Sequence, residues 1–200
     1  MADRHRSRII ADLTYSRDIL VHALADESFL RAVAAVSQLA TDVLRRGNKI
    51  LLAGNGGSAA DAQHIACELL SRFHFDRAPL PAIALTTDTS VLTGIGNDYG
   101  YEHVFARQVR GLGVKGDLFV GISTSGHSPN VLAALGMARE HGLVTIGLTG
   151  RSGGRMAELC DLVIRAPSDQ TPFIQQVHIT VGHIICAIAE AEIFGAHHQG

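Results

Sequence analysis

Three side chains that can transfer protons or bind metal ions recur at helical spacing in one short segment. Asp61, His64 and Glu68 lie three and four residues apart in an Ala-rich stretch. Side chains at these intervals share one face of a helix, so two carboxylates and an imidazole would project together. The pattern indicates acid–base or metal chemistry, although a His-x-x-x-Glu match by itself is more often a surface pair.

A Gly-rich turn comes directly before these side chains. The turn Asn55-Gly56-Gly57-Ser58 joins the apolar run Leu51–Ala53 to the helical segment. Glycines remove side chains that would block the approach of an anion, and a helix N-terminus favours negative charge. We therefore expect this turn to bind an anion; the alternative is an ordinary tight turn between strand and helix.

The same turn matches the dinucleotide fingerprint G-x-G-x-x-A from Gly54 to Ala59. A nicotinamide enzyme would also place an acidic residue about 20 residues later, where it binds the ribose. Asp88 is the candidate at the end of the second strand, and it comes roughly ten residues too late. That spacing disfavours an oxidoreductase.

A second loop is rich in hydroxyl groups. It follows the third apolar run and precedes Pro129, which suits the first turn of a helix. Hydroxyl and N–H groups around a helix N-terminus suit a phosphate dianion without any lysine. One hydroxyl would indicate only a helix cap, but this loop carries four, on Ser123, Thr124, Ser125 and Ser128.

A third segment, from Gly94 to Gly100, is expected to be a loop after the second strand. Its Asn97 and Asp98 could bind sugar hydroxyls, or they could simply form a turn. All three loops would lie at the carboxyl ends of strands, where open α/β sheets bind ligands.

The last helical segment adds polar side chains inside an apolar stretch. Gln175 and His183, with His178 between them, could join the first cluster. The set His64, Glu68, Gln175 and His183 suits a divalent ion such as zinc. However, eight residues of straight helix separate Gln175 from His183 by about 12 Å along the axis. Both reach one ion only if their side chains converge from opposite ends, if the helix is irregular, or if a neighbouring subunit contributes.

The remaining pattern predicts one α/β domain. Short apolar runs alternate with helical segments, which indicates a doubly wound parallel sheet. Five strands are expected at 50–53, 82–85, 118–122, 144–148 and 162–164, with helices near 58–73, 101–110, 129–141 and 171–194. Residues 1–48 form two further helices that break at Asp26-Glu27 and belong to the same unit as the domain at 49–195.

Composition narrows the function classes. The 200 residues carry a net charge of −2, which gives no electrostatic reason for nucleic-acid binding. The three cysteines, far apart in sequence, suggest neither a disulfide framework nor a metal knuckle, and we expect a cytoplasmic protein without a signal peptide or membrane span. The last helix is apolar all round, so it and the N-terminal helices predict subunit contacts.

Four stretches resemble the sugar isomerase (SIS) domain family, and within it the phosphoheptose isomerases. They are GNGGSAADAQHIACEL, TTDTSVLTGIGNDYGYEHVFARQV, GISTSGHSPNVLAAL and TPFIQQVHITVGHIIC. The resemblance implies a flavodoxin-like SIS fold, a homotetramer with active sites at subunit interfaces, and conversion of sedoheptulose 7-phosphate to an aldose for lipopolysaccharide or capsule. It implies that one zinc ion per subunit is held by His64, Glu68, Gln175 and His183. It also implies sugar-phosphate binding by Asn55, Gly56, Gly57, Ser58, Glu68, Asn97, Asp98, Ser123, Thr124, Ser125, Ser128 and Gln175.

The expected chemistry suits these residues. Ketose–aldose isomerisation moves a proton between adjacent carbons through an enediol, so it needs a base and an acid. We assign Glu68 as the base and His183 as the acid. A metal lowers the basicity of a carboxylate ligand, which leaves Asp61 or a bound water as an alternative base. A non-catalytic SIS-domain partner protein is the second hypothesis, but it would not need the complete acid–base and metal set.

Overall fold

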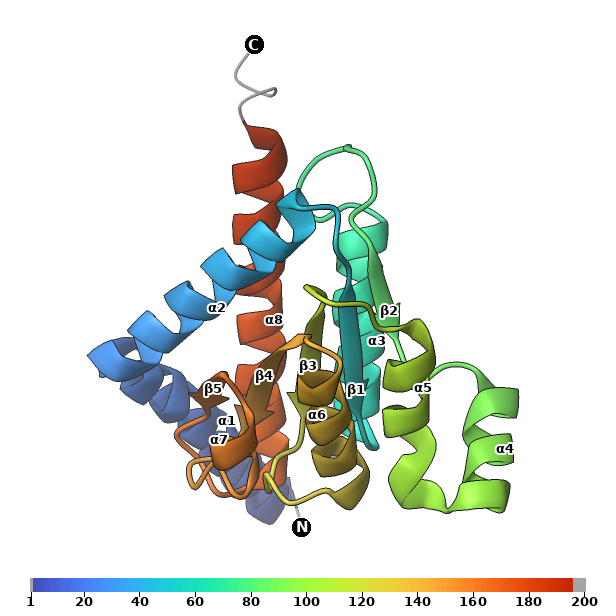
Figure 1. Cartoon of the computed structure of the whole chain (residues 1–200). Helices are drawn as coiled ribbons and strands as arrows, with labels where there is room; N and C mark the ends of the chain where they lie inside the picture. The colour runs from blue at the N-terminus through green and yellow to red at the C-terminus, as the bar shows by residue number, and fades with distance from the viewer. Residues whose placement is uncertain (1, 196–200) are drawn as a thin grey trace.

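The computed structural model describes residues 2–195, and its centre is a parallel sheet with helices on both faces (Figure 1). The strands are β1 (Ile50–Gly54), β2 (Ala82–Ala84), β3 (Leu118–Ile122), β4 (Val144–Thr149) and β5 (Leu162–Arg165). Their order, β2-β1-β3-β4-β5, is the flavodoxin-like order. The predicted five-stranded doubly wound fold is confirmed.

The strands are apolar on both sides because both faces of the sheet are covered. The helices are α1 (Ala2–Ala25), α2 (Glu27–Arg45), α3 (Gly57–Leu70), α4 (Thr89–Tyr99), α5 (Val104–Leu112), α6 (Pro129–Glu140), α7 (Met156–Leu159) and α8 (Thr171–Phe194), with a 3-10 turn η1 (Tyr101–His103). In β1, Ile50 and Leu52 pack with α2, α3 and α8, while Leu51 and Ala53 pack with α5 and α6.

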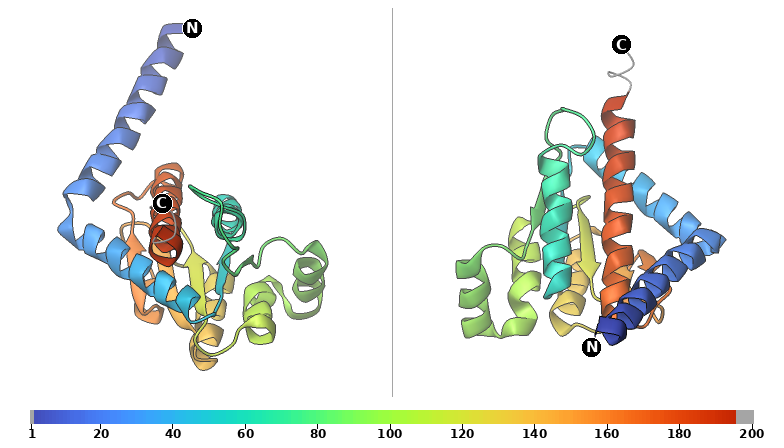
Figure 2. Two further views of the ribbon diagram at one scale, coloured as in Figure 1. Left: turned by 90° about the horizontal axis from the view of Figure 1, so that it is seen from above. Right: turned by 180° about the vertical axis from the view of Figure 1, so that it is seen from behind.

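The N-terminal helices break where the sequence predicts. Asp26 caps α2, because its carboxylate accepts hydrogen bonds from the backbone N–H groups of Ser28 and Phe29 at 2.8 and 3.3 Å. Helix α2 packs across α8 and the sheet, whereas α1 projects from the body (Figure 2). Much of the apolar surface of α1 is therefore exposed in the single chain.

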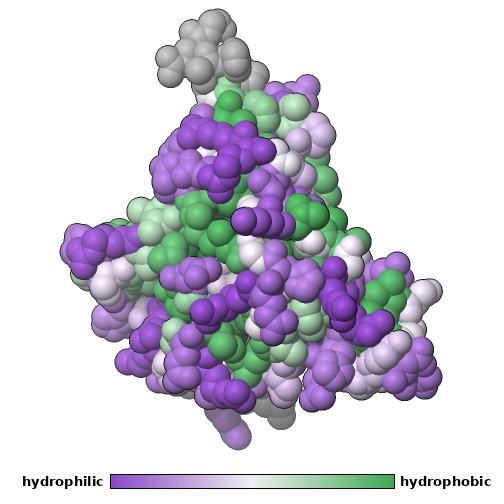
Figure 3. All heavy atoms as spheres, in the orientation of Figure 1, coloured by the Kyte–Doolittle hydropathy of each residue, from purple (hydrophilic) through white to green (hydrophobic). Residues whose placement is uncertain are grey.

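Helix α8 is long and apolar enough to cross a membrane by length and composition, whereas the sequence analysis predicts no membrane span. It instead packs against α2 and α3 and buries two polar side chains, His178 and Glu190. One chain does not cover α8 completely, because Ile184 is 40% exposed, and the predicted subunit contacts of this helix stay a prediction. Figure 3 shows apolar side chains among polar ones on the face it presents, including the upper end of α8.

The segment after β2 differs from the prediction. Residues 94–99 belong to α4, not to a loop, and Gly100 follows the helix. Asp88 caps this helix by accepting a hydrogen bond from the N–H of Val91 at 3.0 Å. Gly94 and Gly96 lower helix propensity, which hid the helix in the sequence. No residue of α4 is buried.

Candidate active site

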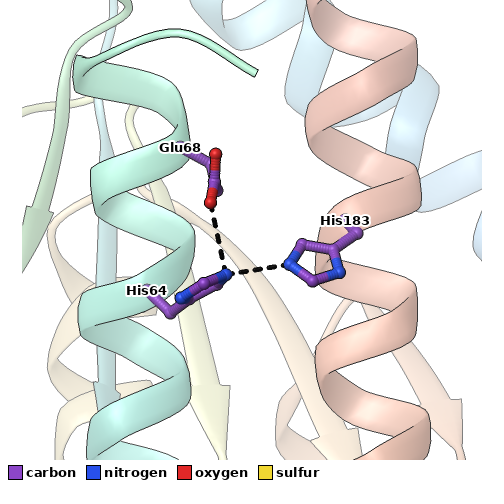
Figure 4. Close-up of side chains that lie close together, drawn as sticks. All are labelled: His64, Glu68 and His183. Carbon is purple, nitrogen blue, oxygen red and sulfur yellow. Dashed lines mark hydrogen bonds and ion pairs between the residues drawn. The ribbon is translucent and has the colours of Figure 1, made fainter. Parts of the chain in front are cut away.

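Three of the predicted metal ligands converge between α3 and α8 (Figure 4). His64 Nε2 lies 2.9 Å from His183 Nε2 and 3.2 Å from Glu68 Oε1. His64 and Glu68 share one face of α3, as their spacing predicts, while His183 comes from α8. The three side chains are partly open to solvent, so a ligand can reach them.

A glycine brings the two helices close at this point. A Cβ atom on Gly182 would lie 2.7 Å from two carbon atoms of the Ile65 side chain, so only glycine fits there without movement. The neighbouring residues in the chain, His183 and His64, therefore meet across the helix contact. The close packing of α3 and α8 is what assembles the site.

A buried ion pair ties the far ends of the same two helices together. Glu190 of α8 accepts hydrogen bonds from the N–H groups of Phe73 and His74 at 2.9 and 2.7 Å, and from Arg77 Nε at 3.0 Å. Arg77 also donates to the backbone carbonyl of Glu68 at 2.8 Å. Burial alone would raise the pKa of Glu190, but these hydrogen bonds outweigh it and lower the pKa below its usual 4.5.

This ion pair supports both proposed proton-transfer groups. The Arg77 contact fixes the end of α3 that carries Glu68. The Phe73 ring, held through its backbone by Glu190, lies 5.6 Å from the His183 ring between centroids. We call this arrangement of Glu190 and Arg77 the buried clasp.

The geometry of the three side chains suits zinc. Imidazole nitrogen and carboxylate oxygen are common zinc ligands, and neighbouring ligand atoms of a tetrahedral site lie roughly 3.3 Å apart. The three donor atoms here all lie within 4.8 Å of one another. The residues present therefore fit such an ion.

Within a single chain, Gln175 lines the cavity at the Gly-rich turn and is not part of the group formed by His64, Glu68 and His183. A Cβ atom on Gly57 would fall 2.8 Å from Gln175 Cδ, so the Gln175 amide covers the Gly-rich turn. Helix α8 is continuous from Gln175 to His183, which places them about 12 Å apart along the axis. The metal-ligand role of Gln175 stays a prediction.

The two predicted anion-binding loops form one cavity of about 330 Å³. Its described lining contains no lysine or arginine and consists of Asn55, Gly56, Gly57, Ser58, Ile122, Ser123, Thr124, Ser128, Thr171 and Gln175. The neighbouring Ser125 is exposed, with its hydroxyl 3.4 Å from that of Ser123. Most of the predicted substrate-binding residues are thus brought together.

Helix N-termini supply the electrostatics of this cavity. Helices α3, α6 and α8 all begin at it, and none of the three has a side-chain hydrogen bond at its N-cap. Free N–H groups and three helix dipoles favour an anion there, and the hydroxyls of Ser123 and Ser128, 2.8 Å apart, add further donors. The cavity suits a phosphate group.

Asn97 and Asp98 are not among the residues that line this cavity. They are exposed on α4, where Asn97 Nδ2 donates to Asp98 Oδ1 at 2.9 Å. Asp98 lines a different hollow beside β2 and α5. Their sugar-binding role stays a prediction. Sequence reasoning also missed Tyr101, whose hydroxyl donates to Asn55 Oδ1 at 3.2 Å.

Two further titratable groups belong to the helices that carry the site, Asp61 to α3 and His178 to α8. Burial raises the pKa of Asp61, against an opposing effect of His64, and Asp61 Oδ2 has no hydrogen-bond partner among the described residues. His178 is fully buried, bonds to the Thr149 carbonyl at 3.0 Å, and has a pKa lowered to about 4 by burial. His178 is therefore a core histidine, while Asp61 remains an alternative base.

Known proteins are similar to this chain in sequence. A family model described as "SIS domain" matches residues 15–150. The phosphoheptose isomerase of Aneurinibacillus thermoaerophilus is 57% identical over 97% of this chain and 96% of its own length. The chain belongs to the SIS domain family. Within this family it groups with the phosphoheptose isomerases, as the sequence resemblance predicts.

Solved structures of SIS domain relatives agree with the fold. The phosphoheptose isomerase of Neisseria gonorrhoeae has a TM-score of 0.87 at 42% identity, covering 93% of this chain and 98% of its own. That of Francisella tularensis has a TM-score of 0.89 at 36% identity, covering 92% of this chain and 97% of its own.

Proposed function

We propose that the chain is a zinc-dependent isomerase that converts sedoheptulose 7-phosphate to D-glycero-D-manno-heptose 7-phosphate. The observation that carries this proposal is the pairing of the Glu68, His64 and His183 group with a cavity built from three helix N-termini. The names of its relatives support a sugar-phosphate isomerase. The reaction would take place in the cytoplasm, as the first step of heptose supply for lipopolysaccharide or capsule.

The proton transfer is assigned to two side chains. Glu68 removes the proton from the carbon beside the carbonyl, and His183 exchanges a proton with the oxygens, which together give the enediol and then the aldose. His64, Glu68 and His183 would hold the zinc ion, with Gln175 of another copy as a fourth ligand. Zinc supplies polarisation of the carbonyl when bound. Asp61 takes the base role if metal binding leaves Glu68 too weakly basic.

The phosphate and the sugar occupy different ends of the proposed site. The phosphate is bound by the turn at Asn55–Ser58 and by the hydroxyl loop at Ser123–Ser128, which supply neutral donors. Asn97 and Asp98 bind sugar hydroxyls in this proposal. Because these two residues lie outside the cavity of a single chain, we assign them to a site completed in the assembly or by movement of α4.

A homotetramer is part of the proposal. Apolar side chains along α1 are exposed in the single chain, among them Ile9 at 58%, Leu13 at 67% and Leu24 at 71%. Exposure of such a surface favours contacts with other copies. Light scattering at micromolar concentration tests the assembly, and a monomer there would contradict it.

The activity can be tested directly. The zinc-loaded protein is incubated with sedoheptulose 7-phosphate, and NMR follows the anomeric region for a new aldose. The Glu68→Gln variant is the control for contaminating isomerase. An aldose signal from the wild type alone supports the proposal, whereas none from a folded, zinc-loaded protein would favour the non-catalytic partner protein.

A further inference from the structure

One side chain of the proposed phosphate cavity is held by a network from two other segments. Asn55 and Asn130 form a double amide pair: Asn55 Nδ2 donates to Asn130 Oδ1 at 2.9 Å, and Asn130 Nδ2 donates to Asn55 Oδ1 at 2.8 Å. The Tyr101 hydroxyl also donates to Asn55 Oδ1, at 3.2 Å. The network joins the β1–α3 turn, the start of α6 and the η1 turn.

The backbone sets the direction of every bond in this network. The N–H of Val131 can only donate, and it donates to Asn130 Oδ1 at 3.0 Å. That contact identifies the acceptor end of the Asn130 amide, so its nitrogen must face Asn55 Oδ1. The Asn55 oxygen then has both lone pairs occupied, by Asn130 and by Tyr101.

Only one polar group of the Asn55 side chain is left for a ligand. Its nitrogen carries two N–H groups, and one of them is used by Asn130. The second has no hydrogen bond to another residue of the described chain. Asn55 lines the cavity, so it offers a donor there and no free acceptor.

We propose that Asn130 and Tyr101 are positioning residues that hold Asn55 as a hydrogen-bond donor to a phosphate oxygen of the substrate. Asn130 is 2% exposed and lies behind Asn55, so it acts on the ligand through the Asn55 amide. Tyr101 is 62% exposed and comes from the segment next to α4. This inference rests on the proposed function for the identity of the ligand.

The network also explains why an amide, and not a carboxylate, suits position 55. An aspartate there would present oxygens alone, and one of them would face the acceptor Asn130 Oδ1. It would also direct negative charge at an anion cavity. The asparagine pair gives the donor direction that a phosphate requires.

A double-mutant cycle tests the proposal. The probe is borohydride-reduced sedoheptulose 7-phosphate, which keeps the phosphate but lacks the carbonyl and cannot isomerise. Calorimetry measures its dissociation constant for Asn130→Ala and Tyr101→Phe, each made in the wild type and in the Asn55→Ala variant. Tyr99→Phe is the matched control, since Tyr99 is also exposed and its ring stacks with Arg107.

In the wild-type background each change should weaken binding by about three- to tenfold, the net worth of one hydrogen bond. In the Asn55→Ala background neither change should weaken binding of the probe further. With sedoheptulose 7-phosphate as the substrate, KM of the Asn130→Ala and Tyr101→Phe variants should rise with the dissociation constant, while kcat stays within about twofold. Tyr99→Phe should leave binding unchanged.

Two results would overturn the proposal. Equal losses in both backgrounds would show that Asn130 and Tyr101 act on the fold and not through Asn55. Wild-type affinity in Tyr101→Phe and in a folded Asn130→Ala would show that Asn55 needs no such support. The probe reports binding without turnover. If both changes weaken binding only when Asn55 is present, but the protein does not isomerise the sugar phosphate, the proposed reaction is contradicted and the positioning role is still supported.

Discussion

Replacing Glu190 by glutamine should destabilise the fold far more than the loss of one charge at the surface. The carboxylate is fully buried and accepts from two backbone N–H groups and from Arg77, whose side chain is 1% exposed. An amide at this position can accept through one atom only, and its NH₂ group would face a donor. Arg77 would then remain buried with its charge unpaired.

The burial of both side chains sets the expected loss of folding free energy. Breaking a buried ion pair by removing one partner costs about 3 to 5 kcal/mol. For a chain of this length each kcal/mol shifts the melting temperature by about 2 to 4 °C, so Glu190→Gln should melt roughly 6 to 20 °C lower. The measurement is chemical and thermal unfolding followed by circular dichroism, at fixed protein and zinc concentrations.

Glu192→Gln is the matched control on the same helix. Glu192 lies 3.1 Å from Arg45 in an ion pair whose side chains are 38% and 44% exposed, and such pairs are worth about 1 kcal/mol or less. The stability difference between the wild type and Glu190→Gln should also shrink as pH falls below about 4.5. The pKa of Glu190 is lowered in the folded state, so its contribution is present above the unfolded pKa and is lost on acidification. Equal losses in the two variants would refute the reasoning about the buried clasp.

Three further predictions concern the core and the site. Burial lowers the pKa of His178 to about 4 in the folded chain, against 6.5 in the unfolded chain. Unfolding therefore takes up a proton below pH 6.5, and about 3 kcal/mol of stability should be lost as the pH falls from 6.5 to 4. His178→Gln should flatten that part of the curve, and a parallel curve would contradict the assignment. Ser125→Ala should weaken binding of the reduced sugar phosphate by about 1 to 3 kcal/mol with unchanged melting; unchanged affinity would place the phosphate elsewhere. Chelation should abolish isomerisation and zinc should restore it, while full activity in metal-free protein would remove zinc from the mechanism.

The sheet could be predicted because its signals are local. Each strand is a short apolar run, and Asp26 marks a helix start by residue type and position. Helix α4 is harder to predict, because an aspartate at a strand end such as Asp88 suits a ligand contact as well as a helix cap, and two glycines mask the helical pattern. Local pattern therefore predicts most elements but misses two helices, α4 with its weak propensity and the four-residue α7 (Met156–Leu159).

The partners of the site residues could not be predicted in the same way. Arg77 pairs with a glutamate 113 residues away, and Asn55 pairs with Asn130 75 residues away. Such pairings depend on how elements pack, which no spacing in the sequence encodes. The convergence of His183 on His64 was a prediction from residue chemistry, and the close contact at a glycine of α8 provides its structural basis.

The assignment of Glu68 as the base is tested most directly by hydrogen exchange in Glu68→Gln. Glutamine keeps the size of the side chain and an oxygen near His64, but it removes the basic carboxylate. Turnover should fall by about 100-fold or more, the usual worth of a positioned general base. The reduced sugar phosphate should still bind, and zinc content should be measured beside it.

In D₂O the wild type should incorporate deuterium from solvent at the carbon beside the carbonyl, from which the base removes the proton. NMR of sedoheptulose 7-phosphate and of the aldose product measures this incorporation. The zinc-loaded Glu68→Gln variant should introduce none on the same timescale, because no base remains to form the enediol. Near-normal turnover and deuterium incorporation in that variant would contradict the account and move the base role to Asp61 or His183.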